Sequence, residues 1–207
     1  MIILAFDTCL DKMYVTLSDD KKILSSKIVT NKDNKYHSAF LISTIKEVLK
    51  ENNITPQNVD AIATNIGPGS FTGIRACTTV ARTMAQQLNI PAPGISSLEI
   101  LAELAPENKI PIVALDARKN SAYFYINNEI KGAVQIEEVQ EILSKTGDEY
   151  YLITDNKLKE ILGGTSYQEK DYPLGDILAK LAFKKLQSEE CKWQELKPLY
   201  IQPPPMG

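Results

Sequence analysis

The residue types best suited to chemistry lie in one glycine-rich segment, Gly67-Pro68-Gly69-Ser70-Phe71-Thr72-Gly73-Ile74-Arg75. This segment follows a predicted buried strand and leads into a predicted helix. Glycine permits positive φ angles and close backbone approach, and a helix N-terminus carries unpaired N–H groups and a partial positive charge. Such a segment could hold a phosphate. The candidate contacts to an anion or nucleotide are Gly69, Ser70, Gly73 and Arg75.

The spacing of the segment excludes two common nucleotide-binding motifs. A Walker A loop continues with Gly-Lys-Ser/Thr, whereas Gly73 is followed by Ile74 and Arg75. In the dinucleotide motif Gly-x-Gly-x-x-Gly the last glycine stands one residue earlier than Gly73 does here. A second interpretation therefore stays open, in which the segment is a tight strand-to-helix turn and Phe71 is a hydrophobic plug.

Other reactive side chains are few and far apart in the sequence. Asp7 and Asp116 each end an apolar run; Asp7 is a vestige of a kinase phosphate site or a turn cap, and Asp116 could pair with Arg118 or the neighbouring sheet. His37 is the single histidine, and we interpret it as a helix-start or packing residue. Metal sites and His-dependent triads draw on several such side chains. We therefore predict no catalytic residue and no metal site.

Composition limits what the chain could bind by itself. The net charge is −3, with 23 basic and 26 acidic residues, and Arg occurs only three times. Proteins that grip nucleic acid alone usually present a basic surface. The three cysteines are widely spaced, which is typical of reduced thiols in a cytoplasmic protein. The apolar run at residues 1–6 is too short for a signal peptide or a membrane span.

Two halves of the sequence repeat one order of elements. Apolar periodicity in each half predicts three strands, a helix, a fourth strand and a second helix. The predicted elements span residues 2–6, 13–17, 23–29, 37–51, 59–66 and 72–88 in the first half, and 109–115, 122–126, 130–136, 137–145, 150–154 and 156–162 in the second. A short strand near 92–95, a last helix over 174–187 and a mobile proline tail at 203–205 complete the prediction.

The repeated order is typical of the actin-like duplicated α/β fold (ASKHA, ribonuclease H-like), in which two small domains each combine a mixed sheet with helices. A polar loop separates the halves. We predict an N-terminal domain over residues 1–106 that carries a partner interface, and a smaller C-terminal domain over residues 107–207. The final helix of the second domain could pack back on the first.

The predicted helix 72–88 has small residues on the side away from its apolar stripe. These residues are Thr72, Ala76, Thr79 and Thr83. An exposed helix face usually carries Lys and Glu, whereas small side chains let another helix approach closely. The helix is either buried on both sides within its own domain or forms a subunit interface, and its composition favours the interface.

Five segments of the sequence together resemble the TsaB (YeaZ) family. They are Ile3-Leu4-Ala5-Phe6-Asp7-Thr8, His37-Ser38, the glycine-rich segment at 67–75, Gly94-Ile95-Ser96-Ser97-Leu98-Glu99 and Ala114-Leu115-Asp116-Ala117-Arg118. The resemblance covers residues 1–125, and beyond them only the element pattern and Pro198-Leu199-Tyr200 agree. It implies a cytoplasmic, non-membrane subunit of the complex that transfers threonylcarbamoyl to N6 of the adenosine 3′ of the anticodon, in tRNAs that read ANN codons.

The resemblance also implies the partners of such a subunit. They are a catalytic paralogue of the TsaD type and an ATPase of the TsaE type, with tRNA bound only through the complex and a homodimer formed by the free chain. In the family the two first-domain helices contact TsaD, which adds Leu41 and Ile45 to the candidate interface. The His-x-x-x-His metal motif of TsaD is absent, since Leu41 stands four residues after His37. ATP and a metal would then belong to the partner subunits.

The leading hypothesis is thus a non-catalytic scaffold and activating subunit without its own active site. The alternative is a small-molecule kinase or ATPase of the same fold that uses Asp7 and Asp116 near a magnesium ion.

Overall fold

The computed structural model describes residues 1–20, 22–30 and 37–202, so the predicted proline tail at 203–205 lies outside the described residues. The chain divides into two compact units. Unit 1 is Met1–Ser97 with Pro173–Leu199, and unit 2 is Leu98–Tyr172 with residues 200–202. The first segment of unit 1 ends at Ser97, before the predicted boundary after residue 106, and the last helix packs on the first sheet.

Unit 1 is built on a five-stranded mixed sheet with the strand order β3-β2-β1-β4-β5. Its strands are β1 (Ile2–Asp7), β2 (Met13–Asp19), β3 (Lys22–Val29), β4 (Ala61–Asn65) and β5 (Gly94–Ile95). The central strand β1 pairs antiparallel with β2 and parallel with β4. Ile3 and the residues up to Asp7 are buried, as expected for an apolar run covered on both faces of the sheet.

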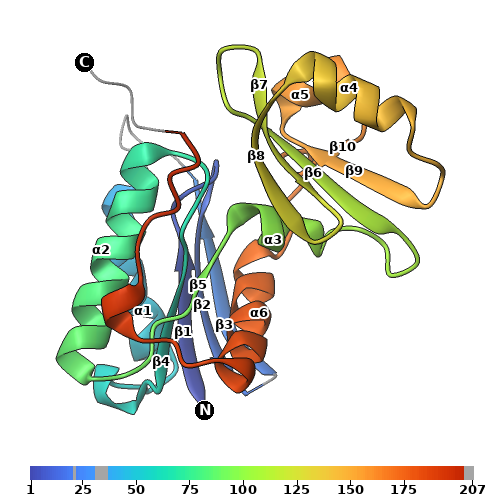
Figure 1. Cartoon of the computed structure of the whole chain (residues 1–207). Helices are drawn as coiled ribbons and strands as arrows, with labels where there is room; N and C mark the ends of the chain where they lie inside the picture. The colour runs from blue at the N-terminus through green and yellow to red at the C-terminus, as the bar shows by residue number, and fades with distance from the viewer. Residues whose placement is uncertain (21, 31–36, 203–207) are drawn as a thin grey trace. The chain divides into compact units, whose positions relative to one another are not determined.

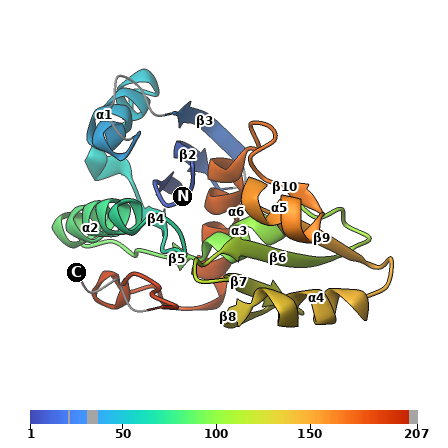
Figure 2. The ribbon, with the colours of Figure 1, turned by 90° about the horizontal axis from the view of Figure 1, so that it is seen from above.

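Helices cover both faces of this sheet, with α1 and α2 on one face and α6 on the other (Figures 1 and 2). The helical elements are η1, a 3-10 turn (His37–Phe40), α1 (Leu41–Glu51), η2 (Pro56–Asn58), α2 (Phe71–Leu88), α6 (Leu174–Ser188) and η3 (Trp193–Glu195). Leu4 and Phe6 of β1 share one buried cluster with Val48 of α1 and Ile74 of α2. A Cβ atom on Gly175 would lie 2.4 Å from Oγ1 of Thr16, so glycine is what lets α6 approach β2.

Unit 2 is built on a second five-stranded mixed sheet, with the order β10-β9-β6-β7-β8. Its elements are α3 (Ser97–Ala102, which begins at the last residue of this part of unit 1), β6 (Ile110–Asp116), β7 (Ser121–Ile126), β8 (Glu129–Gln135), α4 (Ile136–Ser144), β9 (Tyr150–Thr154), α5 (Asn156–Leu162) and β10 (Thr165–Ser166). Phe124 of β7, Val139 of α4 and Leu158 of α5 belong to one buried cluster.

The two sheets have the same topology. Read from the third strand of each half, unit 1 runs β3-β2-β1-β4-β5 and unit 2 runs β8-β7-β6-β9-β10. In both, the first strand is central, antiparallel to the second and parallel to the fourth. The predicted duplicated α/β fold is confirmed. None of the helices in the described part of the chain is both long and apolar enough to span a lipid bilayer.

Candidate partner-binding site

A buried turn after β1 forms the base of the candidate site. Asp7 is only 1% exposed, and its Oδ1 accepts a hydrogen bond of 2.6 Å from the Cys9 N–H. Its Oδ2 accepts one of 2.9 Å from Nδ2 of Asn65. A buried carboxylate needs such donors to offset its lost hydration. These contacts support the interpretation of Asp7 as a turn cap.

Asn65, at the end of β4, connects this turn to the glycine-rich segment. Its Oδ1 accepts hydrogen bonds from the Gly67 N–H at 2.8 Å and from Oγ of Ser97 at 3.0 Å, while its Nδ2 donates to Asp7. The side chain is fully buried. Sequence reasoning missed this residue, although an amide at the end of an apolar strand, directly before a glycine loop, is the signal that could have found it.

The glycines of the segment permit backbone contact with the turn after β1. A Cβ on Gly69 would lie 2.3 Å from the Cys9 carbonyl oxygen, and one on Gly73 would lie 1.8 Å from that of Thr8. The Ser70 N–H donates to the Cys9 carbonyl at 2.7 Å, and Oγ1 of Thr8 donates to the Gly73 carbonyl at 2.6 Å. The close approach explains why glycine stands at both positions.

The contacts at the start of α2 change the predicted anion site. Ser70 is the N-cap residue, and its Oγ accepts a hydrogen bond of 3.2 Å from the Gly73 N–H. Gly73 is buried and its N–H already donates to Ser70, so these contacts do not support Gly73 as an anion contact. Gly69, Ser70 and Arg75 are exposed, so an anion contact by these three stays a prediction.

Phe71 is not the buried plug that the turn interpretation predicted. Its side chain is 37% exposed, because the turn is filled by backbone contacts instead. The Arg75 guanidinium lies 4.0 Å from the centre of the Phe71 ring, which is a cation–π contact on the helix surface. The pair forms the N-terminal end of the surface described next.

The strip of small residues on α2 faces outward from unit 1. Thr72, Thr79 and Thr83 are exposed and Ala76 is half-buried. The helix contains no Asp, Glu or Lys, but Arg75 and Arg82 are exposed beside the strip. The predicted uncharged surface is therefore a small-residue strip flanked by two cations. We call these six residues the α2 strip.

Leu41 and Ile45, which were also predicted in the interface, belong to the core. Their side chains are 2% and 4% exposed and lie in the buried cluster between α1, α2 and the sheet. The apolar stripe of α1 is already used to cover the sheet, so these two residues present no surface to a partner. On the outer side of α1, Ile42 is the large apolar side chain at the surface, 48% exposed.

The turn after β6 in unit 2 repeats the arrangement after β1. Asp116 accepts a hydrogen bond of 3.1 Å from the Arg118 N–H through Oδ1, and its Oδ2 pairs with Nζ of Lys157 at 2.8 Å. The backbone of Arg118, and not its side chain, is thus what contacts Asp116 in these bonds. Across the described residues, no group of three or more His, Cys, Asp or Glu side chains could hold a metal ion.

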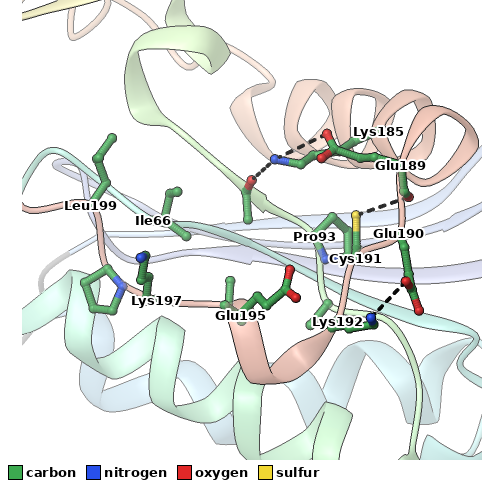
Figure 3. Close-up of a pocket in the computed structure, with 14 residues that line it drawn as sticks. Ile66, Pro93, Lys185, Glu189, Glu190, Cys191, Lys192, Glu195, Lys197 and Leu199 are labelled. Atoms are coloured by element: carbon green, nitrogen blue, oxygen red, sulfur yellow. Dashed lines mark hydrogen bonds and ion pairs between the residues drawn. The ribbon is translucent and has the colours of Figure 1, made fainter.

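Unit 1 also contains an open groove of about 230 Å³, which the sequence did not suggest. It lies between the C-terminal end of α6, the segment that follows it and the chain around β5. Lys185 donates to the Gly94 carbonyl at 3.1 Å and pairs with Glu189 at 3.8 Å, and Lys192 pairs with Glu190 at 3.0 Å (Figure 3). Within each ion pair the opposite charges offset each other along the wall of the groove. We therefore assign the groove no ligand.

Two units of one topology, the first with a glycine loop seated on the turn after its central strand, define the class of the molecule: a duplicated actin-like α/β protein. The solved structure of YeaZ from Pseudomonas aeruginosa superposes with a TM-score of 0.77 at 23% identity, over 96% of this chain and 99% of that one. This similarity confirms the fold.

Sequence similarity identifies the family. Residues 22–168 match the family model described as TsaD: tRNA N6-adenosine threonylcarbamoyltransferase. A protein of Buchnera aphidicola subsp. Schizaphis graminum, named tRNA threonylcarbamoyladenosine biosynthesis protein TsaB, is 30% identical over 167 residues, which cover 74% of this chain and 78% of that protein. The protein of the same name from Bacillus subtilis is 35% identical over 49% of this chain and 44% of its own length. The chain belongs to the TsaB family, within the group that this model describes.

Proposed function

We propose that this chain is a scaffold and activating subunit of the complex that transfers threonylcarbamoyl to N6 of the adenosine 3′ of the anticodon, in tRNAs that read ANN codons. The names of its relatives support the pathway. The observation that carries the subunit role is the α2 strip, an outward helix face of small residues with two arginines and no acid. Such a face suits a partner helix that packs closely and presents acidic or neutral groups.

The partner we propose is a catalytic paralogue of the TsaD type, with an ATPase of the TsaE type joining the pair. In the absence of partners, the same face would join two copies of this chain. ATP, a metal and the contacts to tRNA are assigned to the partners or to the assembled complex. The three free cysteines are consistent with a cytoplasmic location.

The absence of a catalytic role is also part of the proposal. Both carboxylate oxygens of Asp7 accept hydrogen bonds from the chain itself, and Asp116 is held by Lys157 and the Arg118 backbone. These contacts support structural roles for the two strand-end carboxylates. The kinase or ATPase alternative is not favoured by the relatives.

Reconstitution of the tRNA modification tests both parts of the proposal. We expect product only when this chain accompanies the TsaD-type and TsaE-type proteins and threonylcarbamoyl adenylate. The Asp116→Asn variant, which keeps the shape of the side chain, should support turnover within about twofold of the wild type. Full turnover without this chain would contradict the activating role, and a loss of roughly a hundredfold or more in Asp116→Asn at saturating partner would point to a catalytic one.

A further inference from the structure

Two buried cysteines lie in contact beneath the glycine-rich segment. The Sγ atoms of Cys9 and Cys77 are 3.6 Å apart, although the residues are 68 positions apart in the sequence. Both thiols also lie within hydrogen-bonding distance of the Asn65 carbonyl, at 3.3 Å and 3.2 Å. Cys9 belongs to the turn after β1 and Cys77 to the second turn of α2, so the contact joins the two elements that frame the candidate site.

On one side, only the exposed glycine-rich loop separates this cysteine pair from solvent. Gly69 and Ser70 are exposed, and the Ser70 N–H donates directly to the carbonyl of Cys9. A Cβ placed on Gly69 would lie 3.3 Å from the Cys9 Cβ, which shows how closely the exposed loop overlies this cysteine. Cys9 is 1% exposed and Cys77 is fully buried, so a reagent reaches them only when the loop opens. Burial raises the pKa of the Cys9 thiol. For Cys77 burial acts in the same direction, but the hydrogen bond with Cys9 lowers the pKa of that thiol overall. The burial of both sulfurs keeps the reaction slow until the loop opens.

We propose that Cys9 and Cys77 are a redox-reactive pair that a hydroperoxide converts into an intramolecular disulfide. When the loop opens, one of the two sulfurs attacks an oxygen of hydrogen peroxide. The O–O bond breaks, that sulfur becomes a sulfenic acid, and the leaving hydroxide takes the thiol proton and departs as water. The other cysteine sulfur then attacks the sulfenic sulfur, the S–O bond breaks, and the leaving hydroxide takes the second thiol proton to form a second water. Two thiols and one hydrogen peroxide thus give one disulfide and two waters.

The disulfide would tether the start of α2 to the end of β1. Disulfides that close long loops restrict the unfolded chain most strongly, and this one would close a loop of 68 positions. We therefore expect slower local opening, with amide hydrogen exchange over residues 69–77 reduced roughly tenfold in the oxidised chain. This inference is independent of the proposed function, because it concerns only the chemistry of unit 1.

Peptide mapping after oxidation tests the pair. The folded chain is exposed overnight to hydrogen peroxide, quenched with catalase, unfolded and alkylated without reduction. All three cysteines are free thiols before treatment. We expect a cross-linked peptide that joins Cys9 to Cys77, with Cys191 alone alkylated, and recovery of all three thiols after dithiothreitol. The Cys191→Ser variant should give the same cross-link, and Cys77→Ser should give none.

Three results would overturn the proposal. They are alkylation of both Cys9 and Cys77 after the exposure, oxidation of either one to sulfinic or sulfonic acid without the cross-link, and a disulfide of either with Cys191 or with a second chain. Each is read from the same peptide map. If the chain is shown to be cross-linked but the exchange rate over residues 69–77 is unchanged, the expected effect on local opening is wrong, whereas the formation of the disulfide is still supported.

Discussion

At the scale of single residues, Asn65 holds the site together. One buried amide links the turn after β1, the glycine-rich segment and Ser97 through hydrogen bonds of 2.8–3.0 Å. A buried polar group that loses its partner costs about 1–3 kcal/mol. Because three groups bond to this side chain, it connects the loop to both the turn after β1 and Ser97.

Replacement of Asn65 by Ala should therefore lower the free energy of unfolding by about 3 kcal/mol. The Asp7 carboxylate, the Gly67 N–H and the Ser97 hydroxyl would each lose a buried partner. Urea denaturation followed by circular dichroism measures the effect. Gln87→Ala, at an exposed position of α2, is the matched control and should change stability by less than about 0.5 kcal/mol. Equal effects of the two substitutions would disprove the anchoring role.

Gly73 is predicted to be intolerant of any side chain. The Gly73→Ala substitution would place Cβ 1.8 Å from the Thr8 carbonyl oxygen, so backbone must move, at a cost of about 3 kcal/mol or more. Gly132→Ala is the control, since its Cβ meets nothing within 4 Å and only its φ of +96° is unfavourable, worth about 1 kcal/mol. Thermal unfolding of both variants measures the difference in stability. If the Gly73→Ala variant is as stable as the Gly132→Ala variant, the close contact with Thr8 does not constrain the loop.

The sequence alone could not determine the roles of these residues. The glycine pattern predicted both a phosphate loop and a tight turn, and the choice depends on Thr8 and Cys9, which lie some 60 positions away along the chain. Local spacing carries no information about such a partner. The exposure of Phe71 was missed for the same reason, because backbone contacts fill the space that a plug would need.

At the scale of elements, the periodicity of apolar residues predicted the bounds of the long helices closely. The helix predicted over 72–88 is α2 (Phe71–Leu88), and the last helix predicted over 174–187 is α6 (Leu174–Ser188). Each has one apolar stripe, which sets its ends and its buried face. Leu41 and Ile45 show the limit. The family resemblance assigned the whole helix to an interface, whereas the side chains of Leu41 and Ile45 are buried against the sheet and so cannot also face a partner.

The charges of α2 predict how a partner approaches. Because the helix carries Arg75 and Arg82 and no acid, association should be assisted by electrostatic attraction to an acidic face of the partner. Arg82→Glu should slow association with the TsaD-type partner roughly tenfold at low salt. Raising the salt should reduce the difference in association rate between this variant and the wild type, because salt screens the charges. Stopped-flow mixing measures this. Lys184→Glu makes the same charge change on α6, on the opposite face of the sheet, and should leave the association rate unchanged. If this variant slows association as much as Arg82→Glu does, only the net charge of the chain matters.

At the scale of the whole molecule, the duplication was predictable and the exact division into units was not. Both halves show the same order of apolar runs, which was enough for the fold class. The sequence analysis allowed the final helix to pack back on the first domain, and α6 does pack on the first sheet, where Gly175 permits close approach to Thr16 of β2. The end of the first segment of unit 1 at Ser97 differs from the predicted boundary after residue 106. The division into units therefore required the structure.

The overall charge of the molecule predicts its behaviour toward tRNA. With a net charge of −3, the isolated chain should not shift labelled tRNA in a gel at physiological salt, because it lacks the cations needed for counterion release. The assembled complex should shift it. Lysozyme, a basic protein, serves as a positive control for nonspecific binding. A salt-dependent shift by the pure chain would contradict the assignment of tRNA contacts to the complex.

The central claim is that the α2 strip is the surface that binds the catalytic paralogue. Calorimetric titration of that paralogue with this chain tests it most directly. Thr79→Arg places a long cation where a partner helix should pack, and it should weaken binding by about 2 kcal/mol or more, roughly thirtyfold, while the variant stays folded. Gln187→Arg adds the same side chain at an exposed position of α6 and should bind like the wild type. Normal affinity of the Thr79→Arg variant would contradict the claim.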